Sequence, residues 1–196
     1  METALLIVAG WTSGINAYLT VLIIGLGGRL GWVDAPSSLE RTWVLALAAV
    51  AFGLEFVADK LPLFDSAWDL AHTLIRPSVA AAVGVAAAGV PGAALSRPQA
   101  AALAAGLALV AHLSKATTRL AINVSPEPLT NVAASFTEDA VVAGLVALAL
   151  ARPRLAAVLA LVAMVLFAVV ALALISVARR GIRFLFRQVQ GPRLAR

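Results

Sequence analysis

Long runs of apolar residues, separated by short polar connections, dominate the chain. A run of about 20 mostly apolar residues is long enough to cross a bilayer as a helix, and Pro and Gly mark the connections, as in KLPLFDS and NVSPEPLT. The pattern predicts an all-α, polytopic transmembrane bundle of about six spans, without room for a second domain. The predicted spans are Ala4 to Gly27, Thr42 to Ala58, Ala71 to Val90, Gln99 to Thr118, Val132 to Leu150, and Leu155 to Ala178.

The composition of the chain indicates that these apolar runs lie in a membrane. Hydrophobic residues make up 62% of the chain and charged residues 13%, against about 45–50% and about 25% in a soluble domain. Membrane lipids are therefore the first expected partners. The net charge of +5 would suit nucleic acid, but the arginines cluster at span ends and in the tail, as topology signals do. We expect no nucleic-acid partner, and the absence of cysteine removes thiolate chemistry.

The basic residues concentrate after the last span. We therefore divide the chain into a bundle, residues 1–178, and a basic amphipathic tail, residues 179–196, with the sequence RRGIRFLFRQVQGPRLAR. Six complete crossings would put both termini on one side, and the positive-inside rule would make that side cytoplasmic. The prediction is a multi-pass protein of the bacterial inner membrane with cytoplasmic termini, and this orientation depends on the tail.

Charged residues inside two of the runs are the main candidates for function. Glu55 and Asp59 stand four residues apart, as do Lys115 and Arg119, so each pair occupies one face of its helix. A charge near the centre of a span costs about 2.5–3.5 kcal/mol on insertion scales. We therefore predict that the carboxylates face the cations across one interface. The charges would form a functional pathway, hold the helices together, or anchor span ends at the membrane surface.

A polar stripe follows the second span. Asp65, Asp69, His72 and Arg76 recur at helical spacing, and Pro77 predicts a kink or break beside them. Breaks at membrane depth are typical of transporter binding sites.

A second stripe with a similar pattern occupies the fifth run, where Asn131 and Glu138 share a face and Asp139 is adjacent. The matching positions suggest an internal two-helix repeat with exchanged charges. They also suggest that Arg76 pairs with Glu138 or Asp139 as a gate.

Asn16 is the polar residue of interest in the first span, where Gly10 and Gly14 precede it and permit local unwinding. The alternative is a simple interhelical hydrogen bond. Asp65, Asp69 and His72 are metal-ligand types, but no second histidine lies near them, so we assign neither a metal nor a cofactor. His112 is expected to be a neutral, packed or pore-facing imidazole.

Three strings are distinctive together: GWTSGINAYLTVLIIGLGGRLG, LEFVADKLPLFDSAWDLAHTLIRP and HLSKATTRLAINVSPEP. They resemble the bacterial membrane-protein family known as domain of unknown function 4126, over about residues 10–150. The resemblance implies a polytopic inner-membrane protein with these polar motifs as its signature, and it supplies no reaction or substrate.

These observations favour a transporter or permease for a small polar or ionic solute. The sequence has no GxxxxGK[ST] motif, so coupling to an ion gradient is expected. Two alternatives stay open: a membrane-embedded lipid-handling enzyme using Asp65, Asp69 and His72, and a non-catalytic scaffold. The enzyme is disfavoured because no nucleophile and base pair is evident. Homo-oligomerisation stays open.

Overall fold

The computed structural model describes residues 3–61, 64–123 and 128–190. These residues form helices and contain no strand, which confirms the all-α prediction. Five of the helices are long and apolar enough to cross a membrane, and the remaining one, of 17 residues, falls just short in length. The helices are α1 (Thr3–Arg29), α2 (Thr42–Ala58), α3 (Phe64–Ala87), α4 (Arg97–Asn123), α5 (Pro128–Ala151) and α6 (Pro153–Gln190).

The first helix is broken in its middle. Asn16, with φ −146° and ψ 97°, leaves the helical conformation. Its side-chain Oδ1 accepts a hydrogen bond from the backbone N–H of Leu19 at 2.9 Å, as an N-cap residue does. The local unwinding that the sequence left open near Asn16 is therefore present, and α1 consists of two half-helices.

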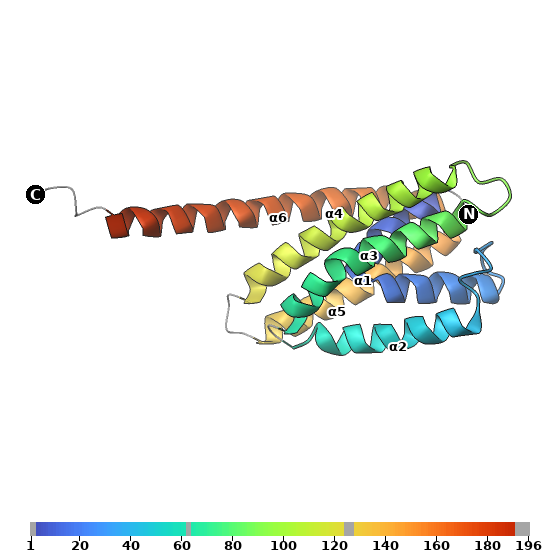
Figure 1. The fold of residues 1–196 in the computed structure, drawn as a ribbon, viewed down its shortest axis with the longest axis horizontal. Coiled ribbons are helices and arrows are strands. Elements are labelled where there is room, and N and C mark those ends of the chain that lie inside the picture. The colour runs from blue at the N-terminus through green and yellow to red at the C-terminus, as the bar shows by residue number, and fades with distance from the viewer. Residues whose placement is uncertain (1–2, 62–63, 124–127, 191–196) are drawn as a thin grey trace, which may run out of the picture.

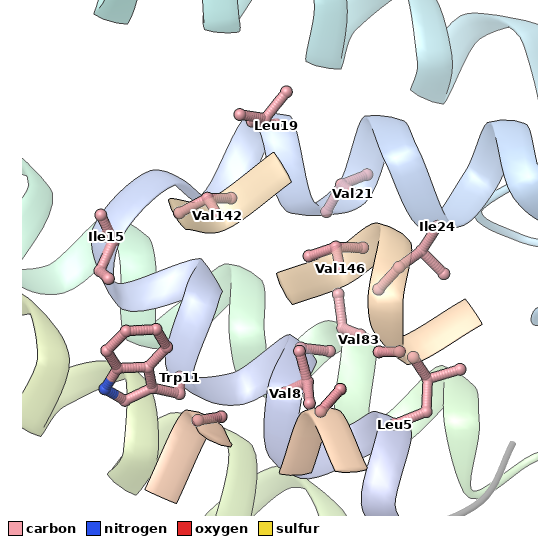
Figure 2. Close-up of a cluster of buried hydrophobic side chains, with 14 of the residues drawn as sticks. Leu5, Val8, Trp11, Ile15, Leu19, Val21, Ile24, Val83, Val142 and Val146 are labelled. Atoms are coloured by element: carbon pink, nitrogen blue, oxygen red, sulfur yellow. The ribbon is translucent and has the colours of Figure 1, made fainter. Parts of the chain in front are cut away.

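The two half-helices fold back on each other. Thr3, at the start of α1, lines a small cavity with Leu95, while Gly28, at its end, lies beside Val90 and Pro91. Both ends of α1 therefore lie next to the α3–α4 connection. Figure 1 shows the same reversal, and in Figure 2 the chain runs from Leu5 across the picture and returns. Each half has 13 residues, about 20 Å, too short for a hydrocarbon core of about 30 Å. Thus α1 is a re-entrant hairpin.

This reversal changes the topology. The other five helices run back and forth along the bundle, so the start of α1 at Thr3 and the end of α6 at Gln190 lie at opposite ends (Figure 1). The prediction that both termini share one side counted the first run as a complete crossing, whereas only the five helices after α1 run along the whole bundle. We call the end with Thr3 and the α3–α4 connection the N-terminal end, and the end where α2 and α4 finish the C-terminal end.

Small residues bring the helices of the bundle close together. Gly84 on α3 lies against the backbone of Ala100 on α4, and Gly14 of α1 lies against the backbone of Ala108, so closely that a Cβ on either glycine would overlap a carbonyl oxygen. In lipid, where van der Waals packing replaces the hydrophobic effect between helices, such close approach stabilises the bundle. The re-entrant hairpin is thereby wedged among the other helices.

The apolar core surrounds α1. Val8 and Ile15 of the first half and Ile24 of the second half are fully buried (Figure 2), and Trp11 packs edge-to-face on Phe167 of α6 at 6.0 Å. By contrast, large apolar side chains on α2 and α6 face outward, as expected for lipid-facing surfaces.

The last helix has no break at the predicted boundary between bundle and tail. It continues through residue 178 to Gln190, 38 residues in all, or about 57 Å. The side chains of residues 182 and 184–190 and the whole of residues 191–196 lie outside the described structure. The amphipathic character of the tail therefore stays a prediction.

Candidate functional site: a buried network of charged side chains

Charged side chains from four helices meet inside the bundle, between its middle and its C-terminal end. We call this set the ion network. Each member is at most 6% exposed, and each was singled out from the sequence. The members are Glu55, Asp59, Asp65, Asp69, Arg76, Lys115, Arg119 and Glu138.

The carboxylates at the end of α2 face the cations of α4, as predicted. Lys115 Nζ lies 2.6 Å from Asp59 Oδ2 and 3.9 Å from Glu55 Oε1. Arg119 Nη2 lies 3.7 Å from Asp59 Oδ2. The opposing faces are confirmed, but the register differs from the simple overlay of the two runs, since Asp59 and not Glu55 makes the shortest contact with Lys115.

Arg76 of α3 forms ion pairs with two carboxylates at once. Its Nη2 donates to Glu55 Oε1 at 2.6 Å, and its Nη1 lies 3.1 Å from Asp69 Oδ1. The predicted pairing of Arg76 with Glu138 or Asp139 is wrong. The helix α1 packs against both α3 and α5 and lies between them, so the guanidinium does not reach the carboxylates of α5.

Glu138 of α5 instead pairs with the cations of α4. Its two carboxylate oxygens accept from Arg119 Nε at 3.1 Å and Nη2 at 2.5 Å, a bidentate pair. Lys115 Nζ lies 3.5 Å away, and Asn131 Oδ1 accepts from Arg119 Nη1 at 2.6 Å. The guanidinium of Arg119 is therefore fully engaged.

The predicted repeat has a counterpart in these contacts. The helices α2 and α4 run in the same direction along the bundle, each followed by a returning helix (Figure 1). In the first hairpin Glu55 of α2 pairs with Arg76 of α3, and in the second Lys115 of α4 pairs with Glu138 of α5. The charges are exchanged between matching positions, as predicted. These two pairs form within each hairpin, while Lys115 of the second hairpin also pairs with Asp59 of the first.

The tip of α1, formed by Gly14, Ile15 and Asn16, reaches the ion network. The carbonyl oxygen of Gly14 accepts from Arg76 at 3.3 Å, and that of Ile15 accepts from Lys115 Nζ at 3.2 Å. Cations thus meet the negative end of the first half-helix. Asn16 Nδ2 donates to Asp139 Oδ1 at 3.0 Å, which places a carboxylate at the positive start of the second half-helix.

Two histidines extend the ion network with fixed tautomers. His72 Nδ1 lies 2.8 Å from the carbonyl of Trp68, so this nitrogen carries a proton, and Nε2 lies 3.1 Å from the hydroxyl of Tyr18. His112 Nδ1 accepts from Arg76 at 2.8 Å, which leaves Nε2 to donate to Thr73 at 3.1 Å. Because a guanidinium can only donate, His112 is neutral in this arrangement, as expected.

Three contributors were not predicted as site residues. Tyr18 reaches His72 from the second half of α1, while Thr73 belongs to the α3 stripe and meets His112. Asn123, at the end of α4, donates to Asp65 Oδ1 at 2.9 Å. Helical spacing from Asp69 and Arg119 would have included Thr73 and Asn123. No sequence signal could have found Tyr18, because its contact depends on the reversal of α1.

Lys60 lies at the border of the ion network, just beyond the end of α2. Its Nζ sits 3.1 Å from the ring centroid of Phe56 and donates to Ser135 Oγ at 3.2 Å. Partial burial lowers the pKa of Lys60, and the nearby carboxylate of Asp139 opposes that shift. Lys60 therefore adds a half-buried cation next to α5.

Negative groups outnumber positive groups in this region. Asp139 joins the five carboxylates of the ion network, while Lys60 joins its three cations. Among the described side chains, Glu55 Oε2, Asp59 Oδ1 and Asp69 Oδ2 have neither a hydrogen-bond donor nor a cation within ion-pair distance. The cations of this region are too few to pair with every carboxylate oxygen. An oxygen without a partner can bind a proton or a small cation.

The metal-ligand types noted in the sequence are not gathered into one site. Asp65 accepts from Ser66 and Asn123, Asp69 lies beside Arg76, and His72 contacts Tyr18 and Trp68. Within the described residues, no group of three or more His, Asp or Glu side chains is arranged to hold a metal ion.

The helix break also differs from its predicted place. Pro77 lies inside α3, which continues from Phe64 to Ala87 without a non-helical residue. The break at membrane depth occurs instead in α1, at Asn16. The missing amide hydrogen of Pro77 does not break the helix. The next residue, Ser78, adds a hydrogen bond within it, from its hydroxyl to the carbonyl of Leu74 at 2.7 Å.

Comparison with known proteins places the chain in a family. No curated protein and no solved structure matches it. The family model described as domain of unknown function (DUF4126) matches residues 3–173, a range that includes α1, the whole ion network and most of α6. With most of its length matched, the chain belongs to the DUF4126 family, whose members share a domain of unknown function.

Proposed function

We propose that this protein is a transporter or permease of the bacterial inner membrane, and that a small polar or ionic solute passes through the ion network beside the tip of α1. One observation carries the proposal. Two half-helix ends meet at membrane depth, within a set of buried charges that pairing alone does not balance.

The half-helix ends supply backbone groups that a continuous helix would keep for itself. The carbonyls of Gly14 and Ile15 are held by Arg76 and Lys115. In discontinuous transporter helices, such carbonyls and the adjacent dipole ends bind substrates and coupling ions. A transported cation would replace the ammonium of Lys115 at Ile15, whereas an anionic group would be held by the cations themselves.

The carboxylates supply the exchangeable part of the mechanism. Glu55 and Asp59 would attract a cation or carry protons, because each has one oxygen without a donor. Lys115 would hold an anionic group of the solute or release Asp59 when it moves away. Arg119 would stay in place, since Glu138 and Asn131 hold its guanidinium.

The orientation belongs to the same proposal. Lys60 lies at the C-terminal end, and α6 carries Arg179, Arg180 and Arg183 beyond this end. The C-terminal end would therefore face the cytoplasm under the positive-inside rule. The N-terminus would then be periplasmic. Since the chain has no cysteine, a single cysteine added after residue 196 and another placed at Thr3 can be labelled separately in intact cells. An impermeant reagent should label only the second.

Flux measurements test the transport proposal. Purified protein in liposomes loaded with pH- and cation-sensitive dyes should show an ion or solute flux that Glu55→Gln abolishes while the protein stays folded. Asp34→Asn is the matched control, because Asp34 is exposed and lies outside the ion network.

A purely structural role gives a different pattern. Glu55→Gln would then remove the partner of Arg76 and lower thermal stability, and adding Arg76→Gln would restore it without any change in flux. If that double variant were stable and behaved like the wild type in every flux assay, the pathway would be refuted. The lipid-handling alternative gains no support from the geometry, because Asp65, Asp69 and His72 are buried.

A further inference from the structure

A groove of about 380 Å³ lies on the side of the bundle between α2 and α3, towards the N-terminal end. These two helices pack only sparsely against each other, so α1 forms the floor of the groove. Its lining is apolar except for three residues: Tyr18 on α1, and Ser38 and Arg41 in the segment before α2. We call the part of the groove beside Ser38 and Arg41 its mouth. No residue that lines this groove belongs to the ion network.

The groove opens onto a surface that faces lipid. Leu47, Val50 and Leu54 on the adjacent face of α2 are each about 60% exposed, and Leu47 itself lines the groove. Inside a bilayer such a surface contacts acyl chains rather than water. An occupant of the groove must therefore be at least partly hydrocarbon.

The mouth of the groove is cationic. A second hollow, of about 840 Å³, adjoins the groove, shares Ser38, Ala82 and Ala86 with it, and is lined by Arg97. Among the described residues, every ion pair within 4 Å belongs to the buried network, so neither Arg41 nor Arg97 has a carboxylate partner. Two unpaired arginines beside an apolar groove are complementary to an anionic head group with an apolar chain.

The depth of the mouth fits a head group. Trp43 lines the groove and is 63% exposed, and exposed tryptophans are typical of the membrane–water interface. A head group at this level would lie beside Arg41 and Arg97, with its chain directed towards the middle of the bundle.

We propose that the groove binds one anionic phospholipid, with the phosphate between Arg41 and Arg97 and an acyl chain extending to Tyr18. This site is separate from the proposed transport function. The inner end of the groove nevertheless adjoins the ion network, because the hydroxyl of Tyr18 bonds His72 at 3.1 Å. A bound chain would hold Tyr18 in place and thereby support that contact.

Native mass spectrometry of the full-length protein tests the site. The protein would be purified in mild detergent and mixed with equal amounts of phosphatidylglycerol and phosphatidylcholine, and the bound lipids would be counted. One tightly bound phosphatidylglycerol is expected. Each arginine contributes about a fivefold change in affinity, so Arg41→Gln with Arg97→Gln should weaken binding about 25-fold. Inorganic phosphate should not displace the lipid, since it has no chain for the groove.

Two further variants keep the test decisive. Arg152→Gln with Arg154→Gln removes two arginines from the same end of the bundle but away from the groove, and it should leave lipid binding unchanged. Ala82 lines both hollows, so Ala82→Phe places a larger side chain in the groove. This variant should weaken lipid binding although both arginines are still present. Equal loss in the Arg152 and Arg154 control would mean non-specific surface attraction. That result, or full lipid retention by both groove variants, would overturn the proposal.

Discussion

The interface between α3 and α4 has two parts that are stabilised by different interactions. Towards the N-terminal end it consists of small residues, with Ala80, Gly84 and Ala87 buried against Ala100 and Ala104. Towards the C-terminal end the same two helices present charged and polar side chains. The charged side chains of this second part are Asp65, Asp69, Arg76, Lys115 and Arg119.

The two parts illustrate two requirements of a membrane bundle. Small residues permit close backbone approach, which is the main source of association between helices in lipid. Buried ion pairs contribute little to net stability, since desolvation offsets most of their attraction, yet removing one partner is costly. The charged part is therefore poorly explained by stability alone, and the following variants separate the two contributions from the largest effect to the smallest.

Removal of a fully engaged cation should have the largest effect. Arg119→Gln leaves Glu138 and Asp59 without their guanidinium partner, and we expect a loss of about 3–5 kcal/mol of stability. The melting temperature in mild detergent and the abundance in membranes should both fall sharply. Arg154→Gln is the control, because Arg154 is exposed and lies outside both the ion network and the groove. A stable Arg119→Gln variant would show that the ion pairs are not needed for folding.

Filling the close-packed part should be the next most damaging change. Gly84→Leu places side-chain atoms against the backbone of Ala100, whereas Gly106→Leu on α4 meets open space. Overpacking of this kind costs about 1–3 kcal/mol. Thermal unfolding in detergent should therefore separate the two leucine variants clearly, and equal melting temperatures would contradict the close packing of α3 on α4.

Loss of the helix cap at the tip of α1 should have an intermediate effect. Asn16→Ala removes the bond to the Leu19 amide and the partner of Asp139, and N-cap losses cost about 0.5–2 kcal/mol. Asn16→Asp is the informative companion, since aspartate can cap the half-helix but places a second carboxylate beside Asp139. Hydrogen exchange of the amides from Ala17 to Thr20 should rise in the alanine variant. Unchanged exchange would argue against the reversal at Asn16.

Removal of a surplus carboxylate should have the smallest effect. Asp69→Asn keeps the size of the side chain and removes its ion pair with Arg76, but the carboxylate oxygens of Asp69 accept no hydrogen bond that would be lost. Arg76 keeps Glu55 as its closer partner. We expect stability within about 1 kcal/mol of the wild type, inside the usual range for point changes. A loss as large as that of Arg119→Gln would contradict the excess of negative groups.

The sequence by itself determined the membrane class, the helices and the members of the ion network. Apolar runs of sufficient length can satisfy their backbone groups in lipid only as helices or closed barrels, and the composition and Gly–Pro breaks made helices the better choice. Four-residue spacing placed Glu55 and Asp59 on one face and Lys115 and Arg119 on another. An unpaired charge in lipid is costly, so opposite charges are expected to pair there. These residues could therefore be identified as partners from the sequence.

Only the tertiary structure decided which partner each charge takes and which run does not cross. Asn16 is compatible with a continuous polar helix, and the chain reverses there because Arg76 and Lys115, from two other helices, satisfy the carbonyls of Gly14 and Ile15. The hairpin then separates α3 from α5, which redirects Arg76 to Glu55 and Asp69. The same reversal leaves Thr3 and Gln190 at opposite ends (Figure 1), because a re-entrant segment adds no crossing. These outcomes depend on contacts between residues far apart in the chain, and local spacing does not encode them.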